Sequence, residues 1–154
     1  MKRILSVVLA SVTALNAITF HVAAADPVSC VVSIYNDRNG LPTGEANAVV
    51  QTPDGYVWIG SYAGLIRYDG TEFRNFSDEG FIPTSTVRSL YVDKSGRLWI
   101  GSNDKGVFVR DNGTFVQPDG QPDDSILCIR NFTETTGGDI IVASSTGMAC
   151  ISDG

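Results

Sequence analysis

Histidine is almost absent from this sequence, and cysteine is scarce. The chain of 154 residues contains one histidine, His21, and three cysteines. Serine and cysteine nucleophiles are usually activated by an imidazole, and many zinc sites use one as a ligand. Residues beyond His21 therefore cannot build such a centre by themselves. We expect no catalytic residue, no metal site and no cofactor in this chain, and hence no enzyme activity of its own.

Long apolar runs are absent after residue 25. The first 25 residues contain Lys2-Arg3, an apolar stretch over 4–20 and the small residues Ala23-Ala24-Ala25. This order is typical of a secretory signal peptide. An uncleaved membrane anchor is the alternative, but polar residues interrupt the stretch and it is short for a membrane span. We predict that residues 1–25 are a signal peptide and that the remaining chain is exported.

Basic residues are also few. Because Lys2 and Arg3 are the only charged residues of the signal peptide, residues 26–154 contain 17 acidic and nine basic residues and carry a net charge of −8. A chain of this charge without a lysine or arginine cluster is poorly suited to phosphate backbones and anionic lipid surfaces. We expect no nucleic-acid partner, and a link to a membrane only through segments outside this sequence.

What the sequence does contain is a repeat. Residues 54–70 read DGYVWIGSYAGLIRYDG, and residues 93–113 read DKSGRLWIGSNDKGVFVRDNG. Trp58 and Trp99 are related by an offset of 41 residues. Four-stranded blades that recur at about 40 residues are typical of β-propellers.

The composition of each copy supports an all-β fold. Short runs rich in Val, Ile, Tyr, Phe and Trp alternate with Gly, Asn and Asp, and no window has sustained helical spacing of apolar residues. We predict about three four-stranded blades of a larger, seven-bladed ring. Blade 1 should span 41–81, blade 2 should span 82–124, and an incomplete blade 3 should span 125–154.

The third copy is weaker than the first two. At an offset of 42 residues, Ile141 takes the place of Trp99 and Ala143 takes the place of Gly101. We expect Trp58 and Trp99 to pack between blades, with ligand stacking as the alternative. Gly101 and its counterpart in the first copy, Gly60, should let a side chain of a neighbouring blade approach the backbone.

The segment before the first copy resembles the end of a blade. Residues 32–42 lie 41 positions ahead of 73–83, so that Tyr35 aligns with Phe76. We therefore predict that residues 26–40 are a closing strand, the outermost strand of the last blade. Closed propellers need four to eight blades, so we expect the chain to be a fragment whose partners include missing C-terminal blades of the same protein.

The stretch NGLPTGEANAVVQTPDGYVWIGSYAGLIRYDG resembles the two-component-regulator propeller repeat. The resemblance implies an extracytoplasmic sensor domain, on the periplasmic or extracellular face of a bacterial membrane. It further implies an output domain such as a histidine kinase or a diguanylate cyclase, and an unknown small-molecule or carbohydrate ligand. A secreted propeller enzyme, either a lyase or a glycoside-active protein, and a non-signalling interaction scaffold are the alternatives.

Ligand-binding residues are not identified by any motif. The loops between the second and third strands of the blades, and the linkers between blades, emerge on one propeller face. These loops should place several polar or aromatic side chains around one rim, which suits a polar ligand, although ordinary solvated loop residues are the alternative. The residues concerned are Ser61, Tyr62, Asn103, Asp104 and Lys105.

The three cysteines, Cys30, Cys128 and Cys150, form an odd set. Cys128 is predicted on the first strand of blade 3 and Cys150 on the third. Two such strands are separated by roughly 10 Å, beyond the reach of a disulfide. We expect buried free thiols.

Overall fold

The computed structural model describes residues 30–119 and 127–152, and the regular secondary structure in these ranges is entirely β-strand. The predicted signal peptide and the first residues of the predicted closing strand lie outside the described residues. All strands belong to the compact unit Ile34–Gly154. The strands are β1 Ala48–Gln51, β2 Val57–Ser61, β3 Gly64–Tyr68, β4 Phe73–Asn75, β5 Val87–Val92, β6 Leu98–Ser102, β7 Val107–Asp111, β8 Thr114–Val116, β9 Asn131–Glu134, β10 Ile140–Ala143 and β11 Met148–Ile151.

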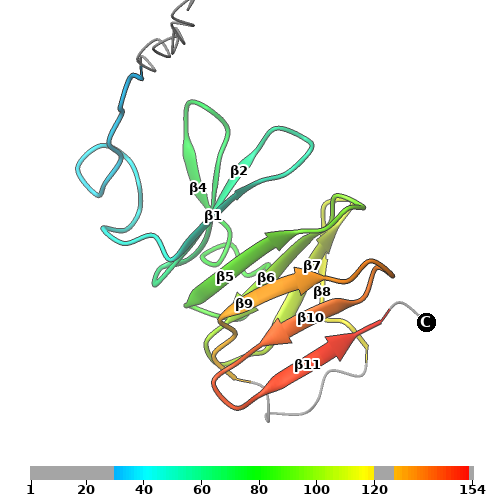
Figure 1. The fold of residues 1–154 in the computed structure, drawn as a ribbon. Coiled ribbons are helices and arrows are strands. Elements are labelled where there is room, and N and C mark those ends of the chain that lie inside the picture. The colour runs from blue at the N-terminus through cyan, green and yellow to red at the C-terminus, as the bar shows by residue number, and fades with distance from the viewer. Residues whose placement is uncertain (1–29, 120–126, 153–154) are drawn as a thin grey trace, which may run out of the picture. The chain divides into compact units, whose positions relative to one another are not determined.

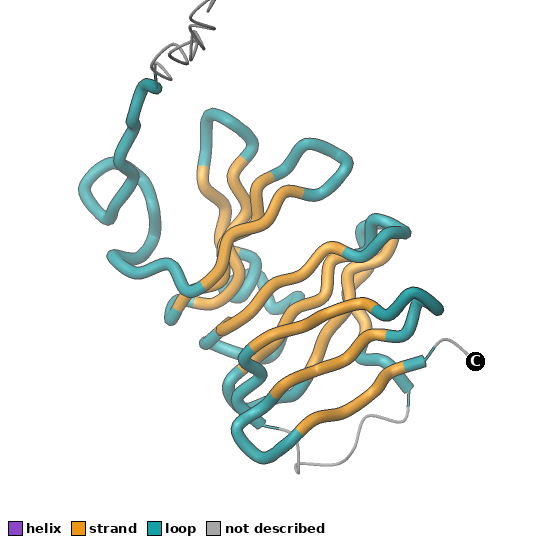
Figure 2. The backbone as a smooth tube through the Cα atoms, viewed as in Figure 1, coloured by secondary structure: helices purple, strands orange, loops and turns teal. Residues whose placement is uncertain are grey.

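The strands form three successive antiparallel sheets. The first has the order β1-β2-β3-β4 and the second β5-β6-β7-β8, while the third pairs β9, β10 and β11 in the same manner. Figure 1 shows that β5 and β9 lie next to each other, and Figure 2 shows how each sheet is a simple meander. This arrangement confirms the predicted all-β fold of tandem blades. Among the described residues, no helix is long and apolar enough to cross a membrane.

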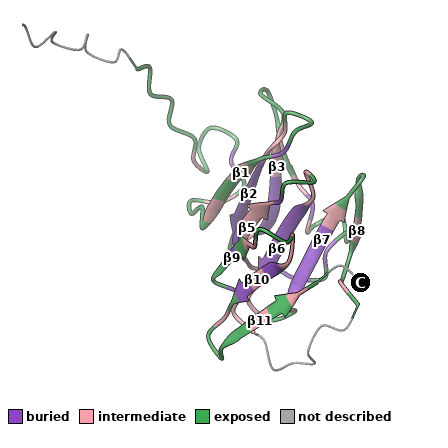
Figure 3. Ribbon diagram, turned by 45° about the vertical axis from the view of Figure 1, so that its right-hand side comes forward, coloured by how far each residue is buried: buried purple, intermediate pink, exposed green. Residues whose placement is uncertain are grey.

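The cores lie between consecutive sheets. Trp58 is completely buried between the first and second sheets, and Trp99 is almost completely buried between the second and third. Figure 3 shows β2 and β6, which carry these residues, as buried strands. The predicted packing role of both tryptophans is therefore confirmed. The first core also contains Leu65, Phe76, Ile82, Val87, Leu98, Ile100 and Phe108, and the second Val107, Val109, Ile129, Phe132, Ile140 and Val142.

The two glycines that follow the tryptophans allow this close packing. A Cβ atom on Gly60 would lie 2.7 Å from Cγ1 of Val87, and one on Gly101 would lie 2.5 Å from Cγ2 of Ile129. Real Cβ atoms essentially never come so close to another atom. Val87 is the first residue of β5 in the second sheet, and Ile129 lies two residues before β9 of the third sheet. The prediction that a neighbouring blade approaches these glycines is therefore confirmed. In the third sheet, Ala143 occupies the corresponding place.

Each indole N–H bonds to the end of the first strand of its own blade. Nε1 of Trp58 donates to Oγ1 of Thr52 at 2.9 Å, and Nε1 of Trp99 donates to Oδ2 of Asp93 at 2.8 Å. The two acceptors are themselves 41 residues apart. The repeat is thus preserved at the level of single hydrogen bonds, although the acceptor changes from a hydroxyl to a carboxylate.

Asp93 is a buried carboxylate whose ionisation stabilises the fold. Its side chain is 1% exposed, and it accepts hydrogen bonds from the Trp99 indole, from the Arg97 side chain at 2.7 Å and from the Arg97 backbone N–H at 2.9 Å. Burial by itself would raise the pKa of Asp93, but the bonds from Trp99 and Arg97 outweigh it and hold the pKa below 3.8. The resulting stabilisation is complete above the unfolded value and is lost as the pH falls through the lower folded value.

We predict that Asp93→Asn lowers the free energy of unfolding at pH 7 by about 1–3 kcal/mol, because the hydrogen bonds to a charged acceptor are lost. The difference from the parent chain should shrink as the pH falls from 3.8 towards the lower folded pKa of Asp93, where the folded parent also loses the charge. Urea unfolding between pH 7 and pH 3 measures both effects. Asp37→Asn, at an exposed carboxyl, serves as the control. A difference that does not change with pH would contradict this account of Asp93.

The segment that precedes β1 packs on the first sheet. The Tyr35 ring lies 5.4 Å from the Tyr68 ring and 5.5 Å from the Phe73 ring, between centroids. Leu41 is buried against Ile59 and Ile66. Residues 34–42 therefore cover part of the face of the first sheet that points away from the second.

The same contacts recur one blade later. Phe76, which is 41 positions after Tyr35, lies 5.8 Å from Phe115, the second-sheet counterpart of Phe73. Ile82, which is 41 positions after Leu41, belongs to the first core. These parallels support the alignment of 32–42 with 73–83. Residues 30–35 form no strand, and pairing of this segment with a last blade stays a prediction.

Two expectations about the cysteines are wrong. Cys128 does not lie on a strand, because β9 begins only at Asn131 and Cys128 has a φ of 54°, which interrupts an extended chain. The thiols are free but not buried, since Cys30 and Cys150 are exposed and Cys128 is half-buried. Cys150 does lie on β11, the third strand of its sheet.

Candidate functional site

The residues expected at the rim lie at one end of the sheets. We use "rim" for the β2–β3 loop, the β6–β7 loop and the linker residues that lead into β5 and β9. Tyr62 in the first of these loops is 49% exposed. Lys105 in the second is exposed as well, although its backbone N–H donates to Oγ of Ser102 at 2.8 Å. These two side chains are therefore accessible to a ligand.

The other three expected residues hold the loops together. Ser61 is fully buried, and its Oγ donates to the carbonyl of Gly64 at 3.1 Å, which closes the β2–β3 turn. Oδ1 of Asp104 accepts from Oγ1 of Thr84 at 2.8 Å. Ser61 is thus excluded from ligand contact, and Asp104 ties its own loop to the linker from the preceding sheet.

Asn103 is the organising residue of the rim. Its carbonyl accepts from the backbone N–H of Cys128 at 2.9 Å, and its backbone N–H donates to Thr86 at 3.1 Å. Its side-chain Oδ1 accepts from Nε of Arg88 at 2.7 Å and from the Cys128 thiol at 3.2 Å. Asn103 therefore connects two inter-blade linkers and orients Arg88, and its backbone groups and Oδ1 are already engaged.

Arg88 is a rim residue that the loop-based prediction missed. The pairing of β5 with β6 shifts register between Val87 and Ser89, so Arg88 is the extra residue of a β-bulge. Its guanidinium carbon lies 5.9 Å from the centre of the Tyr62 ring of the first sheet. The signal was present in the repeat, because Arg88 aligns with Arg130 at the offset of 42 residues.

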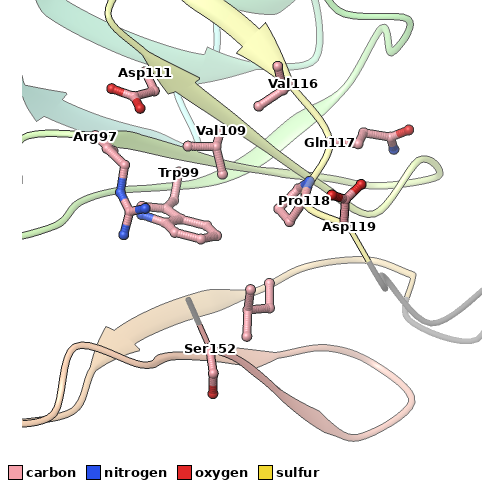
Figure 4. A pocket seen from close by; sticks show the side chains of 10 residues that line it. Arg97, Trp99, Val109, Asp111, Val116, Gln117, Pro118, Asp119 and Ser152 are labelled. Atoms are coloured by element: carbon pink, nitrogen blue, oxygen red, sulfur yellow. The ribbon is translucent and has the colours of Figure 1, made fainter. Parts of the chain in front are cut away.

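One cleft with a lining of aromatic and charged groups lies away from the rim. A cavity of about 520 Å³ is lined by Trp99, Arg97, Val109, Pro118 and other residues of the second and third sheets (Figure 4). Between the first and second sheets, the corresponding space beside Trp58 is filled by aromatic rings, which lie at centroid distances of 5.1 and 6.2 Å. The position of the cleft therefore indicates inter-blade packing space rather than a ligand site.

Two further hollows contain polar groups that are already engaged. One of about 430 Å³ at the other end of the blades is bordered by the ion pair of Arg110 with Asp54, at 3.2 Å. Another of about 570 Å³ is lined by Asn75 and Ser77. Asn75 donates to the carbonyl of Ala63, and Oγ of Ser77 accepts from the backbone of β3. Within residues 30–119 and 127–152, no group of three acidic, His or Cys residues could hold a metal ion.

Comparison with known proteins explains the repeat. Residues 40–63 and 82–104 match the family model of the two-component regulator propeller. These two segments are similar to two-component regulator propeller repeats. Each of them contains a linker, the first strand, the strand with the tryptophan and the following rim loop. The third sheet, in which Ile141 and Ala143 replace Trp and Gly, lies outside the matched segments.

A solved structure shares the fold of these propeller repeats. It is the extracellular domain assigned to the hybrid two-component system BT3049 from B. thetaiotaomicron, with a TM-score of 0.66 and 25% sequence identity. The match covers 77% of this chain but 17% of that one, so the present chain spans less than a fifth of its neighbour's length. No curated protein matches the chain. These findings confirm the resemblance drawn from the sequence and the propeller architecture.

Proposed function

We propose that this chain is part of an exported ligand-sensing propeller, the input module of a bacterial signal-transduction protein with histidine kinase or diguanylate cyclase output. The observation that carries the proposal is the coincidence of two propeller repeats with a fold similar to the extracellular domain of a two-component system. The predicted signal peptide agrees with export. In this proposal the chain binds its ligand and performs no catalysis.

The packing between blades supports a sensing role. At the rim end of their first strands, consecutive blades are linked by side-chain hydrogen bonds to backbone carbonyls. Nδ2 of Asn47 donates to the carbonyl of Val87 at 2.9 Å, and Oγ of Ser89 donates to the carbonyl of Ile129 at 3.0 Å. Both bonds lie next to the rim. A ligand that contacts rim residues of two blades would act on the same junctions, and could alter how the blades meet.

Ligand binding is tested on the exported chain, residues 26–154, with a panel of neutral, acidic and basic saccharides and small metabolites. We expect one chemical class to raise the midpoint of thermal unfolding in proportion to the logarithm of its concentration, because a ligand of the folded state stabilises it. Tyr62→Ala should weaken this shift. Saccharide cleavage by the chain would favour the enzyme alternative. The absence of any ligand-induced shift would favour the interaction scaffold.

Export is tested separately. Residues 1–25 are fused to a reporter enzyme that becomes active only outside the cytoplasm, and a parallel fusion carries Lys2 and Arg3 replaced by Glu. We expect activity from the first fusion and a strong reduction in the second, because a basic start is needed for a signal peptide. An inactive first fusion would contradict the proposed location.

A further inference from the structure

Two arginines occupy equivalent places at the rim. Arg88 is the second residue of β5, and Arg130 immediately precedes β9. Each arginine therefore lies at the beginning of the first strand of its sheet. Both side chains are exposed. The backbone N–H of Arg130 bonds to the carbonyl of Ala143 at 2.8 Å, which places it at the edge of the third sheet just as the bulge places Arg88 at the edge of the second.

The backbone segments that carry the two arginines are adjacent. Oγ of Ser89, the residue after Arg88, donates to the carbonyl of Ile129, the residue before Arg130, at 3.0 Å. Figure 1 shows β5 and β9 side by side, in agreement with this bond. Arg88 also approaches the Tyr62 ring of the first blade, and the backbone of Arg130 enters the third blade beside the strand that carries Arg88.

The charges of these arginines are not neutralised by the described residues. Four other cations form ion pairs there: Arg74 with Glu79, Lys94 with Glu134, Arg97 with Asp93 and Arg110 with Asp54. Neither Arg88 nor Arg130 has a carboxylate within ion-pair distance in these ranges. Arg38, Arg67 and Lys105 also have no ion pair within these ranges, so what distinguishes Arg88 and Arg130 is their equivalent position at the rim of consecutive blades.

The geometry of Arg88 favours an external acceptor. Its Nε is held by Oδ1 of Asn103 at 2.7 Å, while no bond within the described residues uses its two Nη groups. A guanidinium oriented in this way presents a planar pair of donors, which matches the oxygens of a carboxylate or a sulfate. The nearest acidic residue of the β6–β7 loop, Asp104, is already bonded to Thr84.

We propose that Arg88 and Arg130 form an anion-binding site at the rim, which takes a carboxylate or sulfate group of an acidic sugar. The exposed Tyr62 ring provides an apolar face for the sugar ring beside that group. The inference rests on the proposed function in one respect, namely that the sensed ligand would carry this anionic group. It adds the chemical class of the ligand and the residues that recognise it.

The test uses the exported chain and isothermal titration at constant ionic strength. The probes are digalacturonic acid, a sulfated disaccharide, and galactobiose as the neutral counterpart. We expect one acidic probe to bind and galactobiose to bind at least about tenfold more weakly, since charge-assisted bidentate bonds are the strong ones. The two acidic probes distinguish a carboxylate site from a sulfate site. Arg88→Gln and Arg130→Gln should each lower the affinity for the acidic probe by about tenfold or more.

The matched control removes one positive charge from the opposite end of the same strand. Lys94 follows β5 directly, and its substitution Lys94→Gln should leave affinity for the acidic probe within about twofold, because exposed distant charges are screened. Arg88→Lys keeps the positive charge but loses the planar guanidinium that can donate two parallel hydrogen bonds. This variant should bind the acidic probe with intermediate affinity. Thermal unfolding of each variant verifies that it is folded. If Arg88→Gln fails to fold, Arg130→Gln and Arg88→Lys still decide the question.

The inference is overturned if galactobiose binds as tightly as the acidic probes, or if Arg88→Gln and Lys94→Gln have equal effects. It is also overturned if neither acidic probe binds. In all three cases the proposed sensor function survives when another class in the ligand panel raises the unfolding midpoint of the chain. The sensor function fails only when that panel contains no ligand at all.

Discussion

Trp58→Ala should reduce the free energy of unfolding by about 3–5 kcal/mol, the usual cost of truncating a large buried aromatic side chain. Trp58 has no exposed surface. Its ring lies 5.1 Å from the Phe76 ring and 5.0 Å from the Arg110 guanidinium carbon. Truncation would leave a cavity between the first two sheets and would also leave the hydroxyl of Thr52 without its indole donor.

Urea unfolding followed by far-ultraviolet circular dichroism measures this loss, because tryptophan fluorescence changes with the substitution itself. Tyr62→Ala, at a 49% exposed aromatic residue of the same sheet, should change stability by less than about 0.5 kcal/mol. Trp58→Phe should have an intermediate effect, since it keeps most of the apolar volume but loses the bond to Thr52. A loss below about 1 kcal/mol for Trp58→Ala would contradict the packing of the first two sheets.

Gly60→Ala should also destabilise the chain, by about 1–3 kcal/mol, because an added methyl group would overpack the junction between sheets. The new Cβ would lie 2.7 Å from Cγ1 of Val87 and 3.3 Å from the Val87 carbonyl oxygen. The matched control is Gly44→Ala. No atom lies within 4 Å of a Cβ at Gly44, so this change should be neutral or slightly stabilising.

A double-mutant cycle isolates the contact between the two blades. Val87→Ala alone removes buried methyl groups and should cost stability, whereas in the Gly60→Ala background it also removes the clash. The double variant should therefore lose less stability than the sum of the two single variants. Additive losses would show that the added methyl group is accommodated without moving Val87, and would contradict the assigned role of Gly60.

Much of the fold can be predicted from the sequence, because each blade of a propeller repeats the same pattern of strands and turns. The tryptophan, the glycine two residues later and the turn before the tryptophan, at Gly55 and Gly96, recur at 41 residues, and each blade must bury the same face against the next. Trp58 and Gly60 could therefore be assigned from spacing alone. The strand predicted at Cys128 is wrong. Local composition favours a strand there, but a backbone bond to Asn103 of the β6–β7 loop accompanies a positive φ at this residue.

The rim could be predicted only in outline. Loop position correctly identified Tyr62 and Lys105 as exposed, but the same reasoning included Ser61, whose hydroxyl closes the turn. Asn103 was expected to face a ligand, and instead it bonds to residues of two linkers. Such partners lie 15 to 25 residues away. Their choice depends on how adjacent blades meet and not on the local sequence.

The sequence by itself determined the strand period, the apolar faces and the glycines that permit close approach, because these follow from alternation and turn chemistry within one blade. The tertiary structure decided which polar groups remain available. Arg88 is exposed and oriented by a β-bulge, and the backbone of Arg130 comes near it only because the segment that leads into β9 packs beside β5. Side-chain availability is a property of neighbouring blades together, and no single repeat contains that information.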